Sequence, residues 1–446
     1  MKNNILILSS FLLFGCSDFY EPAVVSARKE ATQIGLEIMK NGGNAYDAMI
    51  ATHLALAVVH PTAGNIGGGG FFVYHHKDGS SGSLDFREMA PQKAFKDMYL
   101  DENGDVIPDM STLGGLAVGV PGSISAIYKI HSKFGSLPIE DLFEPAINLA
   151  KNGFVVTQKQ SNSLTGKLKD FIKVNGEESL YSKRYYEGDT IKNIKFAETL
   201  SKISKFGPEI FYGGEIGEMI VNSVKKAGGI ITLKDLENYK SIWREPVKFK
   251  YKNLDIISMS LPSSGGILIG QMLKVIEDYD IKSFGHNSVK AIQLLVEAER
   301  RAYADRSHFM GDPDYMDLPV YELMDKEYVV GRMKNFSWDE ATSSSDVKHG
   351  NIILNESDET THYSIIDKYG NSVSVTTTLN NSYGSKVFVE EGGFFLNNEM
   401  DDFSSKPGHP NFYGLIGSEA NSIQPGKRML SSMTPSIILK NNKPSL

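Results

Sequence analysis

The feature that most constrains the fold is a pair of β-type runs joined by a short loop near the C-terminal end. The first run covers residues 360–366, and the second, 371–378, is β-branched and alternating. Lys368-Tyr369-Gly370 fits a hairpin loop of three residues, because Gly370 can adopt a positive φ. The pattern predicts two antiparallel neighbouring strands, so the chain must contain a sheet.

The register of this hairpin places two hydroxyl groups side by side. If Asp367 pairs with Asn371, Thr360 lies directly opposite Thr378. Residues opposite each other in an antiparallel pair are about 5 Å apart. The sequence thus predicts two threonines together at the open end of the hairpin, with Asn380 just beyond. Taken alone, the pattern favours an ordinary cross-strand pair over a functional site.

Helical and strand patterns alternate along the rest of the chain. Residues 45–59 are apolar almost all round, which predicts a buried helix, and Asn44 with Asp47 predicts a capping box at its start. Residues 288–303 predict an amphipathic helix. Its apolar face is formed by Val289, Ile292, Val296 and Tyr303. Without an internal repeat or a clean break, this mixture predicts one α/β or α+β body.

Composition excludes several classes of protein. The 446 residues include 46 Lys+Arg and 54 Asp+Glu, and 41% are hydrophobic. These values allow a sizeable core and argue against a disordered chain and a nucleic-acid binder. The single cysteine excludes a disulfide framework, and the histidines lack metal-ligand spacing, so we expect no metal and no cofactor. Gly67–Gly70 lacks the Lys and Ser/Thr of a phosphate loop, which favours a tight turn.

The N-terminus predicts export and a lipid anchor. Lys2 precedes an apolar run over residues 5–14, which is too short to span a bilayer about 30 Å thick but fits a secretory signal. Leu13-Phe14-Gly15-Cys16 resembles a bacterial lipobox, in which the cysteine receives a diacylglycerol. We expect residues 1–15 to be a lipoprotein signal peptide, and Ser17 to direct the protein to the outer membrane, facing the periplasm. An ordinary signal peptide with an incidental cysteine is the alternative.

Seven short motifs occur in order from about residue 23 to the end of the chain. They are His60-Pro61-Thr62, Phe86-Arg87-Glu88-Met89-Ala90-Pro91, Pro262-Ser263-Ser264-Gly265-Gly266, Thr360-Thr361-His362-Tyr363-Ser364, Thr378-Leu379-Asn380, Leu396-Asn397-Asn398-Glu399-Met400-Asp401-Asp402-Phe403 and Leu430-Ser431-Ser432-Met433-Thr434-Pro435. Together they resemble the γ-glutamyltransferase family, also called γ-glutamyltranspeptidase or glutathione hydrolase.

This resemblance implies an α+β fold of the N-terminal nucleophile hydrolase type, a four-layer αββα sandwich. Members of the family cut their own precursor before a threonine, here between Glu359 and Thr360. Residues 16–359 then correspond to the large subunit and residues 360–446 to the small one. The two subunits are expected to stay paired in one body after the cut.

The resemblance also implies the chemistry. Thr360 first attacks the preceding carbonyl, and its freed α-amine, with a reference pKa of about 7.7–8.0, can then act as a base. The same hydroxyl takes a γ-glutamyl group as an ester from glutathione or a related compound. Water completes hydrolysis, and an amino acid or peptide amine completes transpeptidation.

The substrate's head group carries an α-carboxylate and an α-ammonium, so both charges must be recognised. By resemblance, Arg87 binds the carboxylate with its planar fork, assisted by Ser431 and Ser432. The residues expected to hold the ammonium are Glu399, Asn380 and Asp402. Thr378 is expected to bond the nucleophile's oxygen, and the segment 404–417, with Tyr413, resembles a lid loop.

The C-terminal end departs from the family pattern. The chain stops at Leu446, eleven residues after Pro435, whereas the family's small subunit continues through a Gly-Gly oxyanion hole. The resemblance therefore implies C-terminal truncation, in a fragment or a degenerate copy. A missing oxyanion donor costs about 10²–10³ in rate.

Two alternatives to a γ-glutamyl hydrolase and transpeptidase stay open at this point. One is an acylase of the same fold that acts on a glutaryl β-lactam, whose acyl group has no ammonium. The other is an inactive lipoprotein that binds γ-glutamyl compounds. The set of Arg87, Glu399 and Asp402 favours an acyl group that resembles an amino acid.

Overall fold

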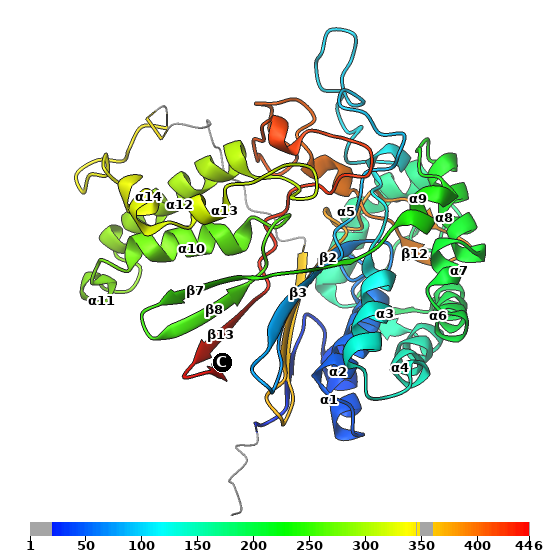
Figure 1. Ribbon diagram of the computed structural model, residues 1–446. Helices are drawn as coiled ribbons and strands as arrows, with labels where there is room; N and C mark the ends of the chain where they lie inside the picture. The colour runs from blue at the N-terminus through cyan, green and yellow to red at the C-terminus, as the bar shows by residue number, and fades with distance from the viewer. Residues whose placement is uncertain (1–19, 345, 348–359, 446) are drawn as a thin grey trace, which may run out of the picture.

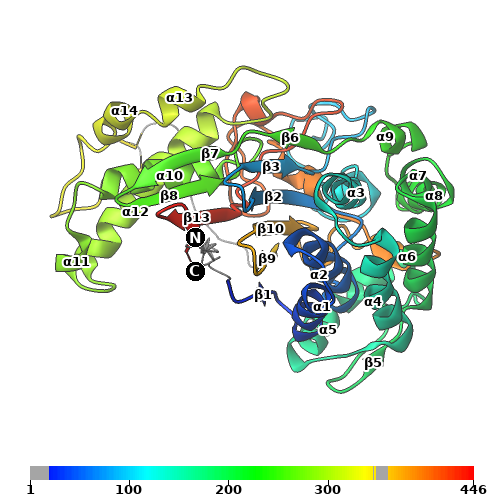
Figure 2. The ribbon, with the colours of Figure 1, turned by 60° about the horizontal axis from the view of Figure 1, so that its bottom comes forward.

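The computed structural model describes residues 20–344, 346–347 and 360–445. Two sheets pack face to face, and helices cover both outer sides (Figures 1 and 2). The six-stranded sheet has the order β1 (Ala23–Val25), β9 (Thr360–Ile366), β10 (Ser372–Thr378), β2 (Gly69–His75), β3 (Ser81–Asp85), β6 (Ile242–Arg244). The four-stranded sheet has the order β14 (Lys443–Pro444), β13 (Ser436–Lys440), β8 (Leu254–Ser258), β7 (Val247–Tyr251).

Apolar side chains from both sheets fill the space between them. Phe71 and Val73 of β2 pack with Ile257 of β8 and with Ile437 and Leu439 of β13. All five side chains are buried, as expected where two sheets share one core. Two helical layers outside two packed sheets confirm the predicted αββα sandwich.

The helical layer behind the six-stranded sheet contains most of the helices (Figure 2). They are α1 (Lys29–Lys40), α2 (Ala45–Val59), α3 (Ser123–Phe134), α4 (Ile139–Asn152), α5 (Gln158–Asn175), α6 (Ile194–Phe206), α7 (Glu209–Tyr212), α8 (Glu215–Lys226) and α9 (Leu233–Asn238). The short pairs β4 (Phe154–Val155) with β5 (Thr190–Ile191) and β11 (Phe388–Val389) with β12 (Phe394–Phe395) lie among them.

Helix α2 forms the centre of this layer, as its sequence predicts. Every residue from Ala45 to Val59 is buried, and the helix contacts β9 and β10. The capping box is present: Asn44 accepts from the Asp47 backbone N–H, and the Asp47 carboxylate accepts from that of Asn44. A helix that is apolar on all sides is stable only between other layers.

The opposite helical layer covers the four-stranded sheet. It consists of α10 (Gly265–Ile276), α11 (Ile281–Phe284), α12 (Val289–Phe309), α13 (Val320–Leu323) and α14 (Lys326–Gly331). The apolar face predicted for α12 is wrong in part, because Val289, Ile292 and Val296 are largely exposed. The buried face is formed instead by Leu294, Ala298 and Ala302, which pack toward α10 and α14. Alanine side chains on this face let α12 approach its neighbouring helices closely. The sequence analysis considered only large apolar side chains and therefore chose the wrong face.

The predicted hairpin and its register are confirmed. Thr360 pairs with Thr378 and Ile366 with Ser372. The Asp367 carboxylate organises the turn, because its oxygens accept from the N–H groups of Tyr369 and Asn371 and from that of Ala45 at the start of α2. Gly370 has a φ of 88°, as the loop requires.

Some predictions lie outside the described residues. These are the signal peptide over 1–15, Cys16 and Glu359, so the subunit boundary is described only on its Thr360 side. Among residues 20–344, 346–347 and 360–445, no helix has the length and apolar character needed to cross a membrane.

Candidate active site

The open end of the hairpin brings three strands together at one level. Thr378, the last residue of β10, pairs with Thr360 of β9 on one side and with Gly69 of β2 on the other. Thr378 is buried and Thr360 is exposed. The Asn380 N–H donates to Thr378 Oγ1 at 2.8 Å. The expected nucleophile thus stands beside a fixed hydroxyl and remains accessible.

The glycine run before β2 holds this corner in place. Asn65 Nδ2 donates to the carbonyl oxygen of Thr378 at 2.9 Å, and Asn65 Oδ1 accepts from the Gly68 N–H at 3.0 Å. A Cβ on Gly68 would lie 2.2 Å from the Thr378 carbonyl oxygen. The close backbone approach predicted for the run is confirmed, but the predicted tight turn is not found, because Gly67 forms a β-bridge with Leu396 and Gly69 and Gly70 begin β2.

Arg87 is buried and bonded to two of the predicted site residues. Its Nη1 donates to Glu399 Oε2 at 2.5 Å, its Nη2 donates to Asp402 Oδ2, and its Nε donates to the carbonyl oxygen of Met429 at 3.2 Å. The arginine and the carboxylates expected at opposite ends of the head group are therefore in direct contact. Burial lowers the pKa of Arg87, but Glu399 and Asp402 outweigh it and raise that pKa overall.

Glu88 adds a third carboxyl group that the sequence analysis did not assign to the site. It is buried, its Oε2 lies 3.7 Å from Arg87 Nη1, and neither of its oxygens has a hydrogen-bond partner among the described residues. Burial raises the pKa of Glu88 to about 8 and raises that of Glu399 as well. A charged residue directly beside Arg87 in the quoted motif was the available signal.

Asn380 links the hairpin to the acidic segment. Its Nδ2 donates to the carbonyl oxygen of Asn398 at 3.0 Å. The next residue, Glu399, begins a 3₁₀ turn over Glu399–Asp402. Asn397 Oδ1 accepts from the Glu399 N–H at 3.0 Å and thereby fixes the start of this turn. The contacts from Thr378 through Asn380 to Glu399 are continuous.

The Ser431–Ser432 segment lies beside the loop before α10. Ser431 donates its N–H to the Pro262 carbonyl oxygen at 2.9 Å, and its own carbonyl oxygen accepts from the Ser264 N–H at 2.8 Å. The Ser432 hydroxyl is buried and has no hydrogen-bond partner among the described residues. Because Met429 binds Arg87, the same segment joins the serines to the arginine.

The predicted lid contacts the acidic segment. Asn411 Nδ2 donates to Asp402 Oδ1 at 3.3 Å, and the Phe412 N–H donates to Asp401 Oδ2 at 3.0 Å. Tyr413 donates its N–H to Asn411 Oδ1 at 3.1 Å. A hollow of about 290 Å³ lies between this loop and residues 106–112. Asp401, the neighbour of Asp402 in the chain, is among the residues that line it.

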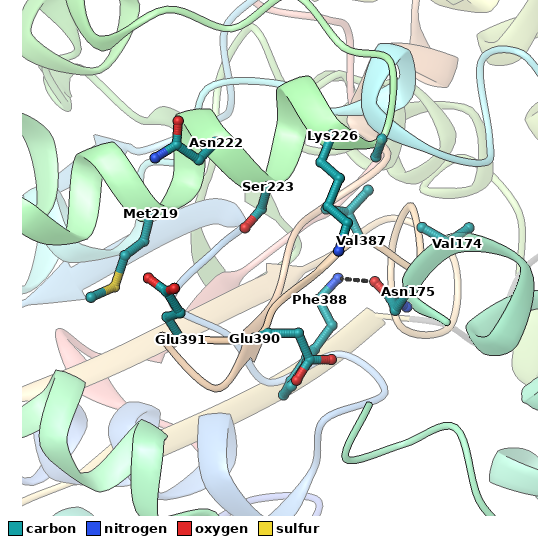
Figure 3. A pocket seen from close by; sticks show the side chains of 11 residues that line it. Val174, Asn175, Met219, Asn222, Ser223, Lys226, Val387, Phe388, Glu390 and Glu391 are labelled. Carbon is teal, nitrogen blue, oxygen red and sulfur yellow. Dashed lines mark hydrogen bonds between the residues drawn. The ribbon is translucent and has the colours of Figure 1, made fainter. Parts of the chain in front are cut away.

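A second cavity, of about 200 Å³, lies elsewhere in the fold (Figure 3). Lys226 of α8, Asn175 of α5 and Glu391 of the turn after β11 point into it. It contains none of the predicted site residues. Within the described part of the chain, no cluster of His, Cys, Asp or Glu side chains could hold a metal ion.

Comparison with known proteins identifies the family. The sequence model described as gamma-glutamyltranspeptidase matches residues 31–446. The chain belongs to the γ-glutamyltranspeptidase family. It is similar to the glutathione hydrolase proenzyme of Escherichia coli (strain K12), with 43% identity over 432 residues that cover 94% of this chain and 73% of the relative.

A solved structure and an acylase relative extend the comparison. The crystal structure of Helicobacter pylori gamma-glutamyltranspeptidase is similar with a TM-score of 0.72 and 42% identity, and the match covers 75% of this chain and 97% of that one. The Acylase ACY 1 proenzyme of Pseudomonas sp. (strain SE83) is 35% identical over 429 residues, covering 94% of this chain and 74% of the relative. The relatives of this chain thus include an acylase beside glutathione hydrolases.

Proposed function

We propose that this enzyme is a γ-glutamyl hydrolase and transpeptidase that cuts its own chain before Thr360. The observation that carries the proposal is the continuous set of contacts from Thr378, opposite Thr360, through Asn380 to Glu399 and Arg87. It joins a hydroxyl nucleophile to a charged cluster suited to a glutamyl head group. The relative named glutathione hydrolase proenzyme supports both the substrate class and the self-cleavage.

Self-cleavage needs only groups of the chain itself and one water molecule. The Thr360 hydroxyl attacks the carbonyl carbon of Glu359, the peptide C–N bond breaks, and the Thr360 nitrogen becomes a free amine. The resulting ester is hydrolysed by water, which leaves a carboxylate on Glu359 and restores the hydroxyl. The new α-amine then accepts the hydroxyl's proton during catalysis, since its reference pKa is about 7.7–8.0.

The catalytic cycle uses the same hydroxyl. Thr360 Oγ attacks the γ-carbonyl carbon of the substrate, the amide bond breaks, and the leaving amine takes a proton from the Thr360 ammonium. Water or an acceptor amine then attacks the γ-glutamyl ester and releases glutamate or a new γ-glutamyl amide. Thr378, fixed by the Asn380 N–H, donates its hydroxyl hydrogen to the nucleophile's oxygen.

When the substrate's head group binds, Arg87 exchanges one of its carboxylate partners for the substrate. The α-carboxylate of the substrate takes one donor of the Arg87 fork, and the carboxylate it displaces, Asp402 or Glu399, binds the α-ammonium. Three carboxyl groups surround one guanidinium, so carboxyl oxygens are in place to accept hydrogen bonds from an ammonium. Ser431, Ser432 and Asn380 complete the polar wall, and Tyr413 lies in the lid.

A glutaryl β-lactam acylase is the second candidate, and the Acylase ACY 1 relative favours it. A glutaryl group has a carboxylate and no ammonium. It would leave the carboxylates of Glu399 and Asp402 without a cationic partner when it binds Arg87. An unpaired buried charge costs several kcal/mol, so the cluster favours the γ-glutamyl group.

Export and anchoring are a separate part of the proposal. The sequence Leu13-Phe14-Gly15-Cys16 supports cleavage before Cys16 and attachment of a diacylglycerol to its thiol. The mature protein then lies in the periplasm, held to the outer membrane, where γ-glutamyl compounds reach it from outside the cytoplasm.

The test compares two chromogenic substrates that differ only in the ammonium. We expect the purified chain to release the aniline from a γ-L-glutamyl anilide faster than from a glutaryl anilide, and faster again when glycylglycine is added as acceptor. The Thr360→Ala variant serves as the blank. Preference for the glutaryl anilide would support the acylase. Binding of L-glutamate without turnover of either anilide would support the inactive binding protein.

A further inference from the structure

Arg306 is a buried cation that has no ion-pair partner among the described residues. It lies in the last turn of α12 and is 4% exposed. The other buried arginines, Arg87, Arg301 and Arg428, each have a carboxylate within ion-pair distance. Within the part of the chain that the structure describes, no carboxylate pairs with Arg306. Burial lowers the pKa of Arg306 from its ordinary value, which is the electrostatic sign of an uncompensated charge.

A single residue, Ser264, connects Arg306 to the serines of the candidate active site. Its Nε donates to Ser264 Oγ at 3.0 Å, and Ser264 Oγ donates to the Ser431 carbonyl oxygen at 2.9 Å. The next hydroxyl along the chain, that of Ser432, is buried without a partner among the described residues. The charges of Asp402 and Arg87 both act on Arg306, so all these groups share one neighbourhood.

The segment 429–432 is therefore flanked by two arginines. Arg87 binds it at Met429, and Arg306 reaches it through Ser264 at Ser431. These two arginines differ in their charge environment. Arg87 donates to Glu399 and Asp402 and has Glu88 close by, so its donors are shared before a substrate binds. A substrate that carries both charges needs a second cation on the carboxylate side.

We infer that Arg306 is a second carboxylate-binding residue, which together with the Ser432 hydroxyl binds the α-carboxylate of the γ-glutamyl group. The inference rests on the proposed function and names a residue of the same site. Arg306 supplies the positive charge that Arg87 shares among its own partners. The substrate's carboxylate then lies between the two arginines, and its ammonium faces Glu399 and Asp402.

A purely structural role makes a different prediction. A cation in the last turn of a helix also interacts favourably with the helix dipole, whatever ligand is present. Loss of that role would weaken binding of any ligand by the same factor. The two roles separate when the ligand's α-carboxylate is replaced by a neutral amide of the same shape.

The experiment measures binding by titration calorimetry, so it does not depend on turnover. The ligands are L-glutamate, the hydrolysis product, and its α-amide, L-isoglutamine. We expect Arg306→Gln to weaken L-glutamate binding by about 10- to 100-fold, as for a lost charge-assisted hydrogen bond, and to change L-isoglutamine binding less than about threefold. Arg306→Lys keeps the charge but loses the fork, so an intermediate loss is expected.

Arg300→Gln is the matched control. Arg300 lies on the same helix, and its guanidinium pairs with Glu297 and donates to the Thr342 carbonyl oxygen. We expect its affinities to equal those of the wild type. Equal losses for both ligands in Arg306→Gln, or unchanged L-glutamate binding, would overturn the inference. If Arg306→Gln does not fold, Arg306→Lys decides: an unchanged affinity for L-glutamate overturns it.

Kinetics with two substrates test whether Arg306 binds the α-carboxylate of the γ-glutamyl group or a carboxylate of the leaving group. Glutathione carries a second carboxylate on its leaving group, whereas a γ-glutamyl anilide does not. A loss of kcat/KM in Arg306→Lys with glutathione alone would place Arg306 at the leaving group and overturn the α-carboxylate assignment. A wild-type chain that binds L-glutamate but cleaves neither substrate contradicts the proposed function, and the calorimetric comparison still decides the role of Arg306.

Discussion

Thr360 and Thr378 face each other across β9 and β10, at the end of the hairpin farthest from its turn. The turn fixes the register, and the register makes these two residues partners. Side chains alternate between the two faces along each strand, so the side chains of paired residues lie on the same face. Thr378 is held by the Asn380 N–H at 2.8 Å. A mobile loop could not hold two hydroxyls at this separation as well as paired strands do.

The first prediction concerns self-cleavage. Thr360→Ala removes the hydroxyl proposed to attack the Glu359 carbonyl, so the chain should stay whole. Thr360→Ser keeps a hydroxyl and should still be cut. Thr378→Val keeps the β-branched shape and should slow the cut, because it removes the hydroxyl proposed to donate to Thr360 Oγ. Intact-mass spectrometry over a time course measures all three. Cleavage of the alanine variant at the same bond would contradict the mechanism.

The parts of the fold that the sequence predicts are those with local causes. The hairpin register depends on Asp367, whose carboxylate binds the N–H groups of Tyr369 and Asn371 in its own turn. The start of α2 depends on Asn44 and Asp47, which are three residues apart. Such contacts lie within a few residues of each other, so spacing alone reveals them.

The charged cluster could not be predicted in the same way. Arg87 and Glu399 are separated by 312 residues, and no periodicity encodes which carboxylate meets which guanidinium. The family resemblance indicated that Arg87 and Glu399 belong to one site, but it did not indicate that they contact each other. Glu88 and Arg306 were missed because, in a sequence, a charged residue is assumed to be exposed to solvent until the structure shows that it is buried. The α12 face was misjudged because its packing uses Ala298 and Ala302.

The second prediction concerns stability against acid. His53 is buried beneath the hairpin, where its Nδ1 lies 2.9 Å from the Tyr363 hydroxyl, and burial lowers its pKa to about 4. In the unfolded chain its pKa is about 6.5. Below pH 6.5 the unfolded chain binds a proton that the folded chain does not. His53 therefore lowers stability progressively as the pH falls from about 6.5 to 4, by about 3 kcal/mol in all.

Chemical denaturation at several pH values measures this effect. The free energy of unfolding of the wild type should fall across that range more steeply than that of His53→Gln, which cannot take up the proton. His286→Gln is the control, because His286 is exposed. It should follow the wild-type curve. Parallel curves for His53→Gln and the wild type would show that His53 does not resist protonation.

The third prediction concerns the backbone approach at Gly69, opposite Thr378. A Cβ there would lie 2.4 Å from the Phe86 carbonyl oxygen and 2.7 Å from Glu88 Oε2. Gly69→Ala should therefore destabilise the protein by about 1–3 kcal/mol and displace the Glu88 carboxyl group. Gly166→Ala, exposed in the interior of α5 with nothing within 4 Å, should stabilise it by about 0.5–1 kcal/mol. Thermal melts compare the two, and a neutral Gly69→Ala would contradict the steric account.

The fourth prediction concerns the anchor. Cys16→Ser removes the thiol that receives the diacylglycerol, so the protein should move from the membrane fraction to the soluble periplasmic fraction. Metabolic labelling with a radioactive fatty acid should mark the wild type alone. Ser17→Ala, which changes the neighbouring residue and keeps the thiol, should stay with the membranes. Unchanged partition of Cys16→Ser, together with equal labelling, would remove the lipoprotein assignment.

The last prediction concerns recognition of the ammonium. Asp402 Oδ2 accepts from Arg87 Nη2 and Asp402 Oδ1 accepts from Asn411 Nδ2 at 3.3 Å, so an asparagine of the same shape fits the space but carries no charge. Asp402→Asn should lower kcat/KM for a γ-glutamyl anilide by a factor that corresponds to about 2 kcal/mol or more. It should change kcat/KM for a glutaryl anilide only a few-fold, because that substrate has no ammonium to bind.

The neighbouring carboxylate provides the control for this prediction. Asp401 accepts from the Ser111 hydroxyl at 2.6 Å and from the Phe412 N–H of the lid at 3.0 Å, so it supports the loop and not the head group. Asp401→Asn should therefore lower kcat/KM for both anilides by a similar factor. If Asp402→Asn also lowers both equally, Asp402 has a structural role like that of Asp401, and the ammonium must be bound by Glu399 and Asn380.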